Sequence, residues 1–284
     1  MSERPVQREV RLRSVQPEGA YHRLALDAPE VARTAQPGQF VALSVGGATS
    51  AMLLRRCFSI AGVHDGAVEL LIAARGPGST WLTERRPGST LDLVGPLGGP
   101  FPPVPARTGV VLVGGGYGAA PLLWFAEELT RRGRPAASVQ VVLGAANEGR
   151  LAGVEQARAL GAGVHVTTDD GSAGLQGRVT AAVPAALADA AAAAGGSRPP
   201  EVYACGPMVM LRAVSEVAAA HGSPTWCAVE ESMACGVGVC MTCVLPIRGA
   251  DGVVRNTRTC TEGPTFDAAA IVWDQIPGLD GAGR

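Results

Sequence analysis

The chain has 284 residues, 47% of them hydrophobic, and a formal net charge of −1. A chain of this length can hold two or three modest domains, and its near-neutral charge gives no reason to expect a nucleic acid or a membrane surface as partner. Seven cysteines, an odd number gathered late in the chain, fit a reducing compartment better than a disulfide framework. Because residues 1–15 lack the apolar segment of a secretory signal and no stretch is long enough to span a membrane, we expect a cytoplasmic protein.

The first hundred residues are predicted to form short strands between turns. The apolar segments that read as strands span 41–45, 56–62, 67–73 and 90–96. Many strands at short spacing with little helix are typical of a closed or nearly closed antiparallel barrel. Residues 96–106 are too rich in proline to continue a strand or a helix, so we expect a linker there and a barrel domain over 1–103.

After the linker, continuous apolar runs alternate with helical or Ala-rich segments. The runs span 109–116, 138–145, 163–170 and 201–207. Strands that alternate with helices imply a parallel sheet. We therefore expect an α/β domain over 104–223.

A group of cysteines follows in the last part of the chain, which we assign to a third domain over 224–284. The spacing Cys235-x4-Cys240-x2-Cys243, with Cys260 further on, is the ligand spacing of a plant-type [2Fe–2S] cluster. Glycines between the first two cysteines allow tight turns with positive φ, which point backbone N–H groups at the cluster sulfurs. Zinc is the competing metal, but its usual sites use two Cys-x2-Cys pairs and only one occurs here. Buried, unligated cysteines are the third interpretation.

A glycine-rich turn follows the first strand of the α/β half. Small residues there let the backbone approach a pyrophosphate, and the N-terminus of the following helix favours its charge. The segment 205–208 ends a later strand, at the edge where ligands of open α/β sheets bind. The turn and this strand end predict a nucleotide site. The glycines of the turn are Gly114, Gly115, Gly116 and Gly118.

Two segments of the barrel half suggest a second phosphate-bearing ligand. Residues 55–60 (RRCFSI) offer an arginine for a phosphate, an aromatic ring for stacking and a serine at strand spacing. Residues 76–80 (GPGST) offer backbone N–H groups and hydroxyls to a pyrophosphate. Each segment alone fits an ordinary surface arginine or turn, so the prediction depends on their combination.

Taken together and in order, these segments resemble the electron-transfer subunits of dihydroorotate dehydrogenases. The segments are RRCFSI, GPGST, GPLGGPF, LVGGGYGAAPL, TTDDGSAGLQGRVT, CGPM and EESMACGVGVCMTC. Members of that family are ferredoxin-reductase-like flavoproteins with an added [2Fe–2S] domain. The resemblance extends from about residue 8 to 275. It implies an antiparallel FAD-binding β-barrel, a Rossmann-like parallel α/β domain for NAD, and a small C-terminal [2Fe–2S] domain.

The resemblance also implies roles for individual residues. Arg56 would meet an FAD phosphate, and Ser59 would lie near the reactive flavin nitrogen. Cys57 stands where the family usually has proline, and Ser79 replaces a threonine but keeps a hydroxyl. The other implied FAD contacts are Phe58, Leu71, Ile72, Ala73 and Gly78.

On the nicotinamide side the resemblance implies contacts from the glycine turn and from two strand ends. The contacts beyond the turn are Asp170, Cys205, Gly206, Pro207 and Met208, and Ser59 and Cys205 are the expected catalytic residues. Asp169 and Asp170 end a predicted strand, and between residues 159 and 177 the only basic side chain is that of His165. A carboxylate there would accept hydrogen bonds from a ribose and repel a 2′-phosphate, so we expect NAD(H) rather than NADP(H).

The function implied is electron transfer in pyrimidine (UMP) biosynthesis. A partner subunit with FMN would oxidise dihydroorotate, and electrons would pass through the [2Fe–2S] cluster and FAD of this chain to NAD⁺, in a heterotetramer of two plus two subunits. This chain shows no site for dihydroorotate and should be inactive on it alone. Two alternatives stay open: the small flavin and iron–sulfur subunit of an NADH-dependent ferredoxin:NADP⁺ oxidoreductase or sulfide dehydrogenase, and a non-enzymatic iron–sulfur nucleotide sensor.

Overall fold

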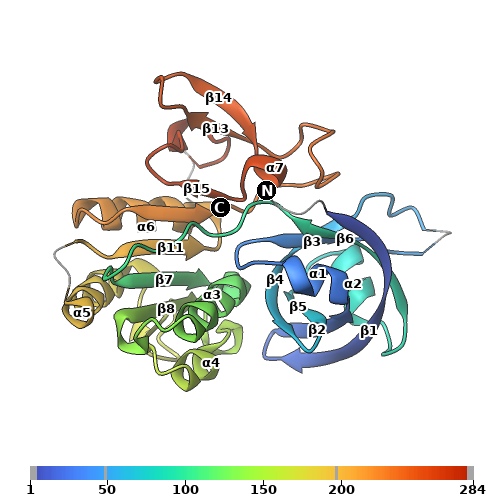
Figure 1. Ribbon diagram of the computed structural model, residues 1–284, viewed down its shortest axis with the longest axis horizontal. Helices are drawn as coiled ribbons and strands as arrows, with labels where there is room; N and C mark the ends of the chain where they lie inside the picture. Colours follow the sequence, from blue (N-terminus) through green and yellow to red (C-terminus); the bar gives the residue numbers. More distant parts are fainter. Residues whose placement is uncertain (1–4, 48–49, 196–197, 280–284) are drawn as a thin grey trace.

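The computed structural model describes residues 5–47, 50–195 and 198–279. Figure 1 shows a barrel and an α/β sheet side by side, with a smaller part that carries the cysteines above both. Within the described ranges, no helix is both long and apolar enough to cross a membrane.

Six antiparallel strands close the barrel in the order β1-β2-β5-β4-β3-β6. The strands are β1 (Val6–Glu18), β2 (Tyr21–Asp27), β3 (Phe40–Leu43), β4 (Arg56–His64), β5 (Ala67–Ile72) and β6 (Thr90–Leu97), with helices α1 (Pro29–Thr34) and α2 (Pro77–Thr83) between them. The predicted antiparallel barrel is confirmed. Its first two strands were not predicted, although in β1 Val10 and Leu12 are buried and Arg11 between them is exposed, which is the alternation of a strand with one face on the core.

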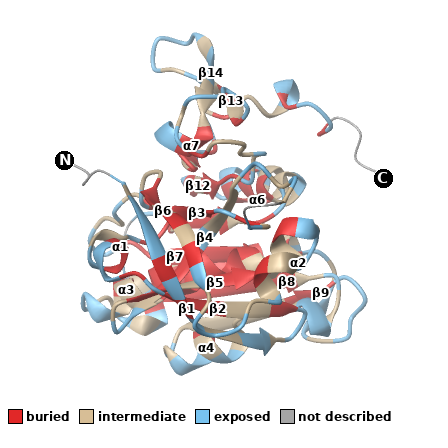
Figure 2. Ribbon diagram, turned by 90° about the vertical axis from the view of Figure 1, so that its right-hand side faces the viewer, coloured by how far each residue is buried: buried red, intermediate tan, exposed pale blue. Residues whose placement is uncertain are grey.

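A seven-stranded sheet with the order β10-β9-β8-β7-β11-β12-β15 forms the second part. Its strands are β7 (Val110–Gly115), β8 (Val139–Ala145), β9 (Gly163–Thr168), β10 (Leu175–Gln176), β11 (Glu201–Cys205), β12 (Thr225–Ala228) and β15 (Thr265–Asp267). The helices are α3 (Ala119–Arg131), α4 (Val154–Ala159), α5 (Val183–Ala194) and α6 (Met208–Ala220), and short 3₁₀ turns are η1 (Gly116–Gly118), η2 (Ala136–Ser138), η3 (Glu148–Arg150) and η4 (Val179–Ala181). All neighbours pair in parallel except β12 and β15. Helices cover both faces, so the central strands are buried on both sides (Figure 2).

Three of the four predicted cysteine ligands lie on a loop between β12 and a hairpin, and the fourth, Cys260, lies in the short helix after the hairpin. The hairpin consists of β13 (Val244–Arg248) and β14 (Val254–Arg258), and it is followed by α7 (Thr259–Glu262) and, near the end of the described chain, η5 (Trp273–Gln275). The α/β sheet continues past residue 223, because β12 and β15 both belong to it. The domain limits therefore remain a proposal, and residues 1–4 and 280–284 of the outer two domains lie outside the described ranges.

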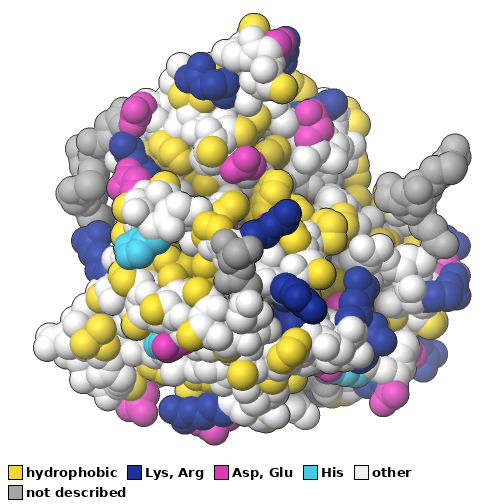
Figure 3. Space-filling view, turned by 60° about the vertical axis from the view of Figure 1, so that its left-hand side comes forward, with side chains coloured by type: hydrophobic (Ala, Val, Ile, Leu, Met, Phe, Trp, Pro, Cys, Tyr) yellow, Lys and Arg dark blue, Asp and Glu magenta, His cyan; other side chains and the backbone are white. Residues whose placement is uncertain are grey.

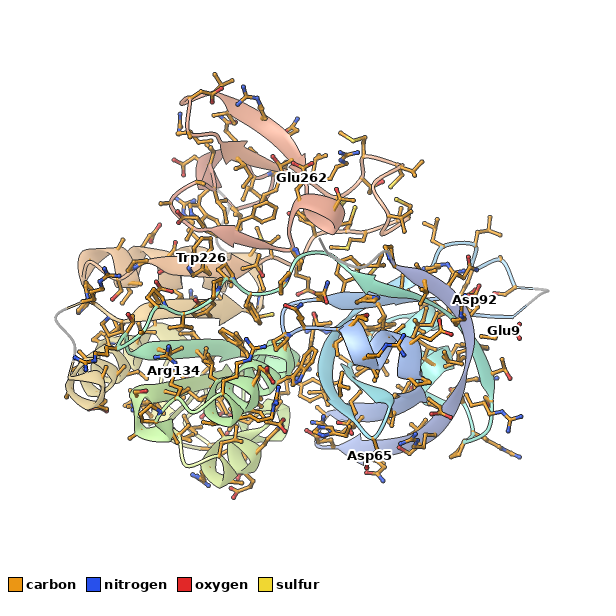
Figure 4. All side chains as sticks on the ribbon, in the orientation of Figure 1. Glu9, Asp65, Asp92, Arg134, Trp226 and Glu262 are labelled. Carbon is orange, nitrogen blue, oxygen red and sulfur yellow. The ribbon has the colours of Figure 1, made fainter. Side chains whose placement is uncertain are left out.

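Contacts between the parts hold them in one arrangement. Trp124 of α3 is buried in the core of the barrel. The linker is fixed by Arg134, which donates to the carbonyl oxygens of Thr108 (2.6 Å) and Pro105 (3.0 Å) and lies beside β7 in Figure 4. Figure 3 shows hydrophobic side chains gathered across the middle of one face, below the part with the hairpin, with arginines beside them. A site between these parts is thus preorganised rather than formed by a loose junction.

Candidate functional site

A cavity of about 1020 Å³ lies where the three parts meet, at the upper end of the range for small-molecule sites. Most of the predicted cofactor contacts line it. Those that do are Arg56, Cys57, Phe58, Ser59, Leu71, Ile72, Ala73, Gly78, Ser79, Gly115, Gly116, Gly118, Cys205, Gly206 and Pro207. Segments far apart in the sequence therefore converge on one space.

Three predicted residues stand outside the cavity lining. Gly114 packs β7 against α3, since a Cβ on it would lie 2.7 Å from the Cα of Ala119. Met208 packs on the core of the α/β part. Asp170 accepts hydrogen bonds from the backbone N–H (2.9 Å) and the hydroxyl (2.6 Å) of Ser172. Gly114 and Met208 therefore have packing roles, whereas Asp170 is exposed and orders its own turn.

At the barrel end, a glycine and a serine arrange the turn before α2. A Cβ on Gly78 would lie 2.9 Å from the Nε of Arg56, so glycine leaves space for that arginine. The hydroxyl of Ser79 accepts hydrogen bonds from the N–H groups of Arg75 (3.0 Å) and Gly76 (3.1 Å). The Ser79 hydroxyl, which was predicted to contact FAD, thus orders its own turn. Arg56 is the basic side chain of β4 that lines the cavity.

At the nucleotide end, glycines allow the turn η1 to approach the end of β11 and Tyr21 at the start of β2. A Cβ on Gly118 would lie only 2.5 Å from the carbonyl oxygen of Cys205. Gly116 adopts φ +54°, and a Cβ there would lie 2.9 Å from the hydroxyl oxygen of Tyr21. A larger residue at Gly118 would separate the turn from the end of β11, and one at Gly116 would press against the barrel, so both positions favour glycine.

Cys205 is a neutral thiol at this strand end. Burial, with the nearby Glu230 carboxylate as a smaller cause, raises the pKa of its thiol to about 12. Ser59, the other expected catalytic residue, is an exposed residue of β4 that lines the same cavity. Neither residue carries charge near neutral pH, which suits a site that receives a hydride acceptor.

A contact among all three parts was not predicted from the sequence. The hydroxyl of Tyr117, in the glycine turn, donates to Glu230 (2.7 Å), and Arg75 of the barrel lies 3.4 Å from the same hydroxyl. The Arg75 guanidinium also lies 5.3 Å from the centre of the Tyr117 ring, and Tyr21 meets this ring edge-on. These residues are distant in sequence, so no local pattern links them. The only hint in the sequence was that Tyr117 lies within the glycine-rich turn.

Two arginines at the nucleotide end were also missed. Arg150 and Arg178 line the cavity together with Asp169. Both are exposed. Within the part of the chain that the structure describes, neither guanidinium makes an ion pair or a hydrogen bond, and the backbone carbonyl of Arg150 accepts a hydrogen bond from the Tyr21 hydroxyl. Arg178 lies one residue beyond the interval in which the sequence shows a single basic side chain. The cavity is therefore lined by two basic side chains as well as by the carboxylate of Asp169.

The four predicted metal ligands gather on one side of the barrel. The loop that carries three of them lies over β3 and β6 (Figure 1), and Cys243 and Cys260 are buried in a layer with Phe40, Ala42 and Leu97. Sulfur-bearing side chains are visible in Figure 4 on the loop near Glu262. The packing explains why two of the four thiols are shielded from water.

The arrangement of these cysteines fits a [2Fe–2S] cluster. The Sγ of Cys235 accepts hydrogen bonds from two backbone N–H groups, of Val237 and Val239 (both 3.4 Å), as expected for a cluster ligand. Hydrogen bonds from Thr242 and then Cys235 lower the pKa of the Cys240 thiol to about 6. Burial, and then a hydrogen bond with Cys243, raise the pKa of Cys260.

These contacts associate the thiols in two pairs, Cys235 with Cys240 and Cys243 with Cys260. Within the described ranges, no group of three or more His, Cys, Asp or Glu side chains is arranged to hold a metal ion. A single zinc needs four ligands in one tetrahedron, whereas two irons need two pairs of thiolates. The donor set and its pairing therefore match the cluster better than zinc.

Two family models match the chain. The oxidoreductase NAD-binding domain matches residues 112–216, and the iron–sulfur cluster binding domain of dihydroorotate dehydrogenase B matches residues 230–272. The dihydroorotate dehydrogenase B (NAD⁺) electron transfer subunit of Bacillus caldolyticus is 36% identical over 255 residues, which cover 88% of this chain and 92% of the relative. That of Desulforamulus reducens is 35% identical over 254 residues, with the same coverage.

Solved structures share the fold. A structure of an NADH-dependent reduced ferredoxin-NADP oxidoreductase, described for flavin-based electron bifurcation, aligns over 93% of this chain and 90% of its own, with a TM-score of 0.76 and 26% identity. A ferredoxin NADP⁺ reductase from Neisseria gonorrhoeae with bound FAD and NADP covers 76% and 92%, with a TM-score of 0.60. At 19% identity the second likeness shows the fold alone.

The fold and the site define an iron–sulfur oxidoreductase with a ferredoxin-reductase-like barrel and an NAD-binding domain. The chain belongs to the family of dihydroorotate dehydrogenase B (NAD⁺) electron transfer subunits. The resemblance found in the sequence is thereby confirmed, and the interpretation as a non-enzymatic sensor is set aside.

Proposed function

We propose that this chain passes electrons from an FMN-containing dihydroorotate dehydrogenase subunit, through a [2Fe–2S] cluster and FAD, to NAD⁺ in pyrimidine (UMP) biosynthesis. One observation carries the proposal: strand β4 borders both proposed cofactor sites. Its residues from Arg56 to Ser59 line the cavity, and Cys57 packs in the layer that holds Cys243 and Cys260. A strand shared by the two sites would bring the two redox groups near each other.

Different residues would bind the two cofactors, FAD on the barrel side and the nicotinamide on the α/β side. When bound, FAD exchanges single electrons with the cluster and a hydride with the nicotinamide. Arg56 would neutralise an FAD phosphate, and residues 71–73 would line the flavin ring. Cys205 and Gly206 would admit the nicotinamide at the carboxyl end of β11, where glycine is needed because a Cβ on Gly206 would lie 2.7 Å from the Cε of Met210.

The partner subunit is proposed to dock on the cluster loop. Val239, Val237 and Met241 of this loop are exposed apolar side chains, with Val239 at 79%. Leu53, at 90% exposure, and Leu54 add to the apolar surface on the loop before β4. Electrons enter at the cluster, so a partner with FMN has to approach it closely, and an FMN subunit that covers these side chains would do so. We propose an assembly of two such subunits with two of these chains.

We place the assembly in the cytoplasm. All seven cysteines are free thiols in the structure, and thiols persist in reducing compartments. A thiolate-held cluster and a hydride acceptor such as NAD⁺ both suit that environment.

A second candidate is the small subunit of an NADH-dependent ferredoxin:NADP⁺ oxidoreductase. The fold alignment at a TM-score of 0.76 favours it, but identity there is 26%, against 36% for the dihydroorotate dehydrogenase relatives. The two functions predict different large subunits. Purification of the tagged chain from its host should recover an FMN protein for the first and a protein with additional iron–sulfur clusters for the second.

The Cys240→Ser variant tests the proposed function. Reconstituted with the FMN subunit, it should lack the cluster and lose dihydroorotate-dependent NAD⁺ reduction. It should keep NADH oxidation by artificial two-electron acceptors, because the cavity with its FAD contacts remains. The matched control is Cys227→Ser, since Cys227 is buried in β12 away from the loop and should retain iron. Coupling at the normal rate in Cys240→Ser would remove the cluster from the electron path.

A further inference from the structure

Cys57 has surroundings that distinguish it from the other predicted FAD contacts. It lies on β4 between Arg56 and Phe58 and lines the cavity with them. Its side chain also packs against the layer of Phe40, Ala42, Leu97, Cys243 and Cys260. The same residue therefore borders the proposed flavin space and two proposed cluster ligands.

The thiol of Cys57 occupies the space beside Gly236 of the cluster loop. A Cβ on Gly236 would lie 3.1 Å from the Cys57 Sγ, with the Cβ of Ala42 (3.7 Å) and the Cδ1 of Leu97 (3.8 Å) next nearest. Gly236 adopts φ +71°, a conformation that suits glycine. Gly236 directly follows Cys235. The packing of Gly236 against the Cys57 thiol therefore determines how close this part of the loop lies to β4.

We propose that Cys57 is a positioning residue for electron transfer: its thiol seats the loop at Gly236 and thereby sets the contact between the cluster ligands and the flavin strand. Electron transfer slows as the gap between two redox groups widens, and a packed atom in that gap shortens the through-space step. Removal of the sulfur would leave a void between β4 and the loop, because the neighbours of a packed site relax only in part. Burial and contacts near the sulfurs also tune the potential of a cluster.

The inference rests on the proposed function, and the test starts from the FAD- and cluster-loaded chain. NADH gives a hydride to the flavin, which is the first phase, and single electrons then move from the flavin to the cluster, which is the second. Both phases are followed by stopped-flow absorbance in wild type and in Cys57→Ala. The EPR spectrum of the reduced cluster is recorded for each protein as a readout independent of turnover.

In Cys57→Ala the second phase should slow several-fold more than the first, and the EPR signal of the cluster should shift. Cys227→Ala removes a buried thiol of β12 that neither lines the cavity nor packs in the layer with Cys243 and Cys260, and it should leave both phases and the spectrum as in wild type. A Cys57→Ala variant that matches Cys227→Ala in both readouts would overturn the inference. Absence of iron from the unsubstituted chain would instead overturn the proposed function.

Two further measurements cover the case in which Cys57→Ala releases iron. Cys57→Ser should retain it, since a hydroxyl still fills most of the space; loss of iron from both variants would make Cys57 a cluster ligand and overturn the positioning role. Gly236→Ala should lower the melting temperature less in a Cys57→Ala background than in wild type, because the added methyl no longer meets the sulfur. Strictly additive effects would show that the two residues do not touch.

Discussion

Asp169 and Asp170 are adjacent in sequence but face different surroundings. The carboxylate of Asp170 is engaged by Ser172, and these hydrogen bonds hold the pKa of Asp170 below its usual range. Asp169 lines the cavity, as does Arg178. A choice between nucleotides at this strand end therefore depends on Asp169 rather than on its neighbour.

We expect the chain to prefer NADH to NADPH, and Asp169→Asn to weaken this preference. The neutral amide keeps the shape but no longer repels a 2′-phosphate, and Arg178 is then free to attract it. Loss of one like-charge contact should improve the efficiency of flavin reduction by NADPH about tenfold, equivalent to about 1.4 kcal/mol. Asp170→Asn is the matched control and should change the ratio much less. Equal reduction by the two nucleotides in wild type would contradict the assignment.

The buried thiol of Cys205 predicts a loss of stability in alkali. In the folded protein the pKa of this thiol is raised from 9.0 to about 12. The stability that the neutral thiol contributes to the fold is therefore fully present below about pH 9 and is lost as the pH rises toward about 12. The melting temperature of Cys205→Ser should therefore fall less than that of wild type between about pH 8 and pH 11. Parallel decreases in the two proteins would show that the thiol is not buried as described.

At the scale of elements, the glycine turn η1 connects all three parts through Tyr117. Tyr117→Phe keeps the ring over Arg75 but removes the hydrogen bond to Glu230. We expect a decrease in the free energy of unfolding of about 1 kcal/mol and faster amide exchange at the start of the cysteine loop, measured by mass spectrometry. Ser89→Ala removes a comparable exposed hydrogen bond far from the cavity and should not change exchange in that loop.

The elements differ in how far the sequence predicts them. Strands β7, β8, β9 and β11 of the α/β sheet and the barrel strands from β3 to β6 were predicted, because their apolar runs are bounded by turn residues. The short strands β10, β12 and β15 were not predicted. The β13–β14 hairpin was not, since it is short and only part of one strand faces a core. The glycine and cysteine motifs predicted local geometry, whereas the contact of Tyr117 with Glu230 joins residues 113 positions apart, which no local pattern contains.

At the scale of the whole molecule, the exposed apolar side chains of the cluster loop predict where the partner binds. Val239→Asp places a charge at the centre of this surface and should weaken association with the FMN subunit by at least tenfold, because an unpaired charge would be buried there. NADH oxidation by two-electron acceptors should remain, since Val239 is 79% exposed and outside the cavity. The control is Val253→Asp at the hairpin tip, an exposed valine on a different surface. Unchanged affinity in Val239→Asp would move the docking surface elsewhere.

The cysteine-bearing segment is an insertion into the α/β sheet and not a tail. Ala228 and Thr265 are register partners in β12 and β15, and the N–H of Val229 donates to the carbonyl oxygen of Pro264 (3.0 Å). The segment thus leaves and re-enters the sheet at a narrow neck, so it cannot swing away on a tether as an appended domain would. A single proteolytic cut between residues 230 and 263 would leave both fragments attached, one through β12 and the other through β15.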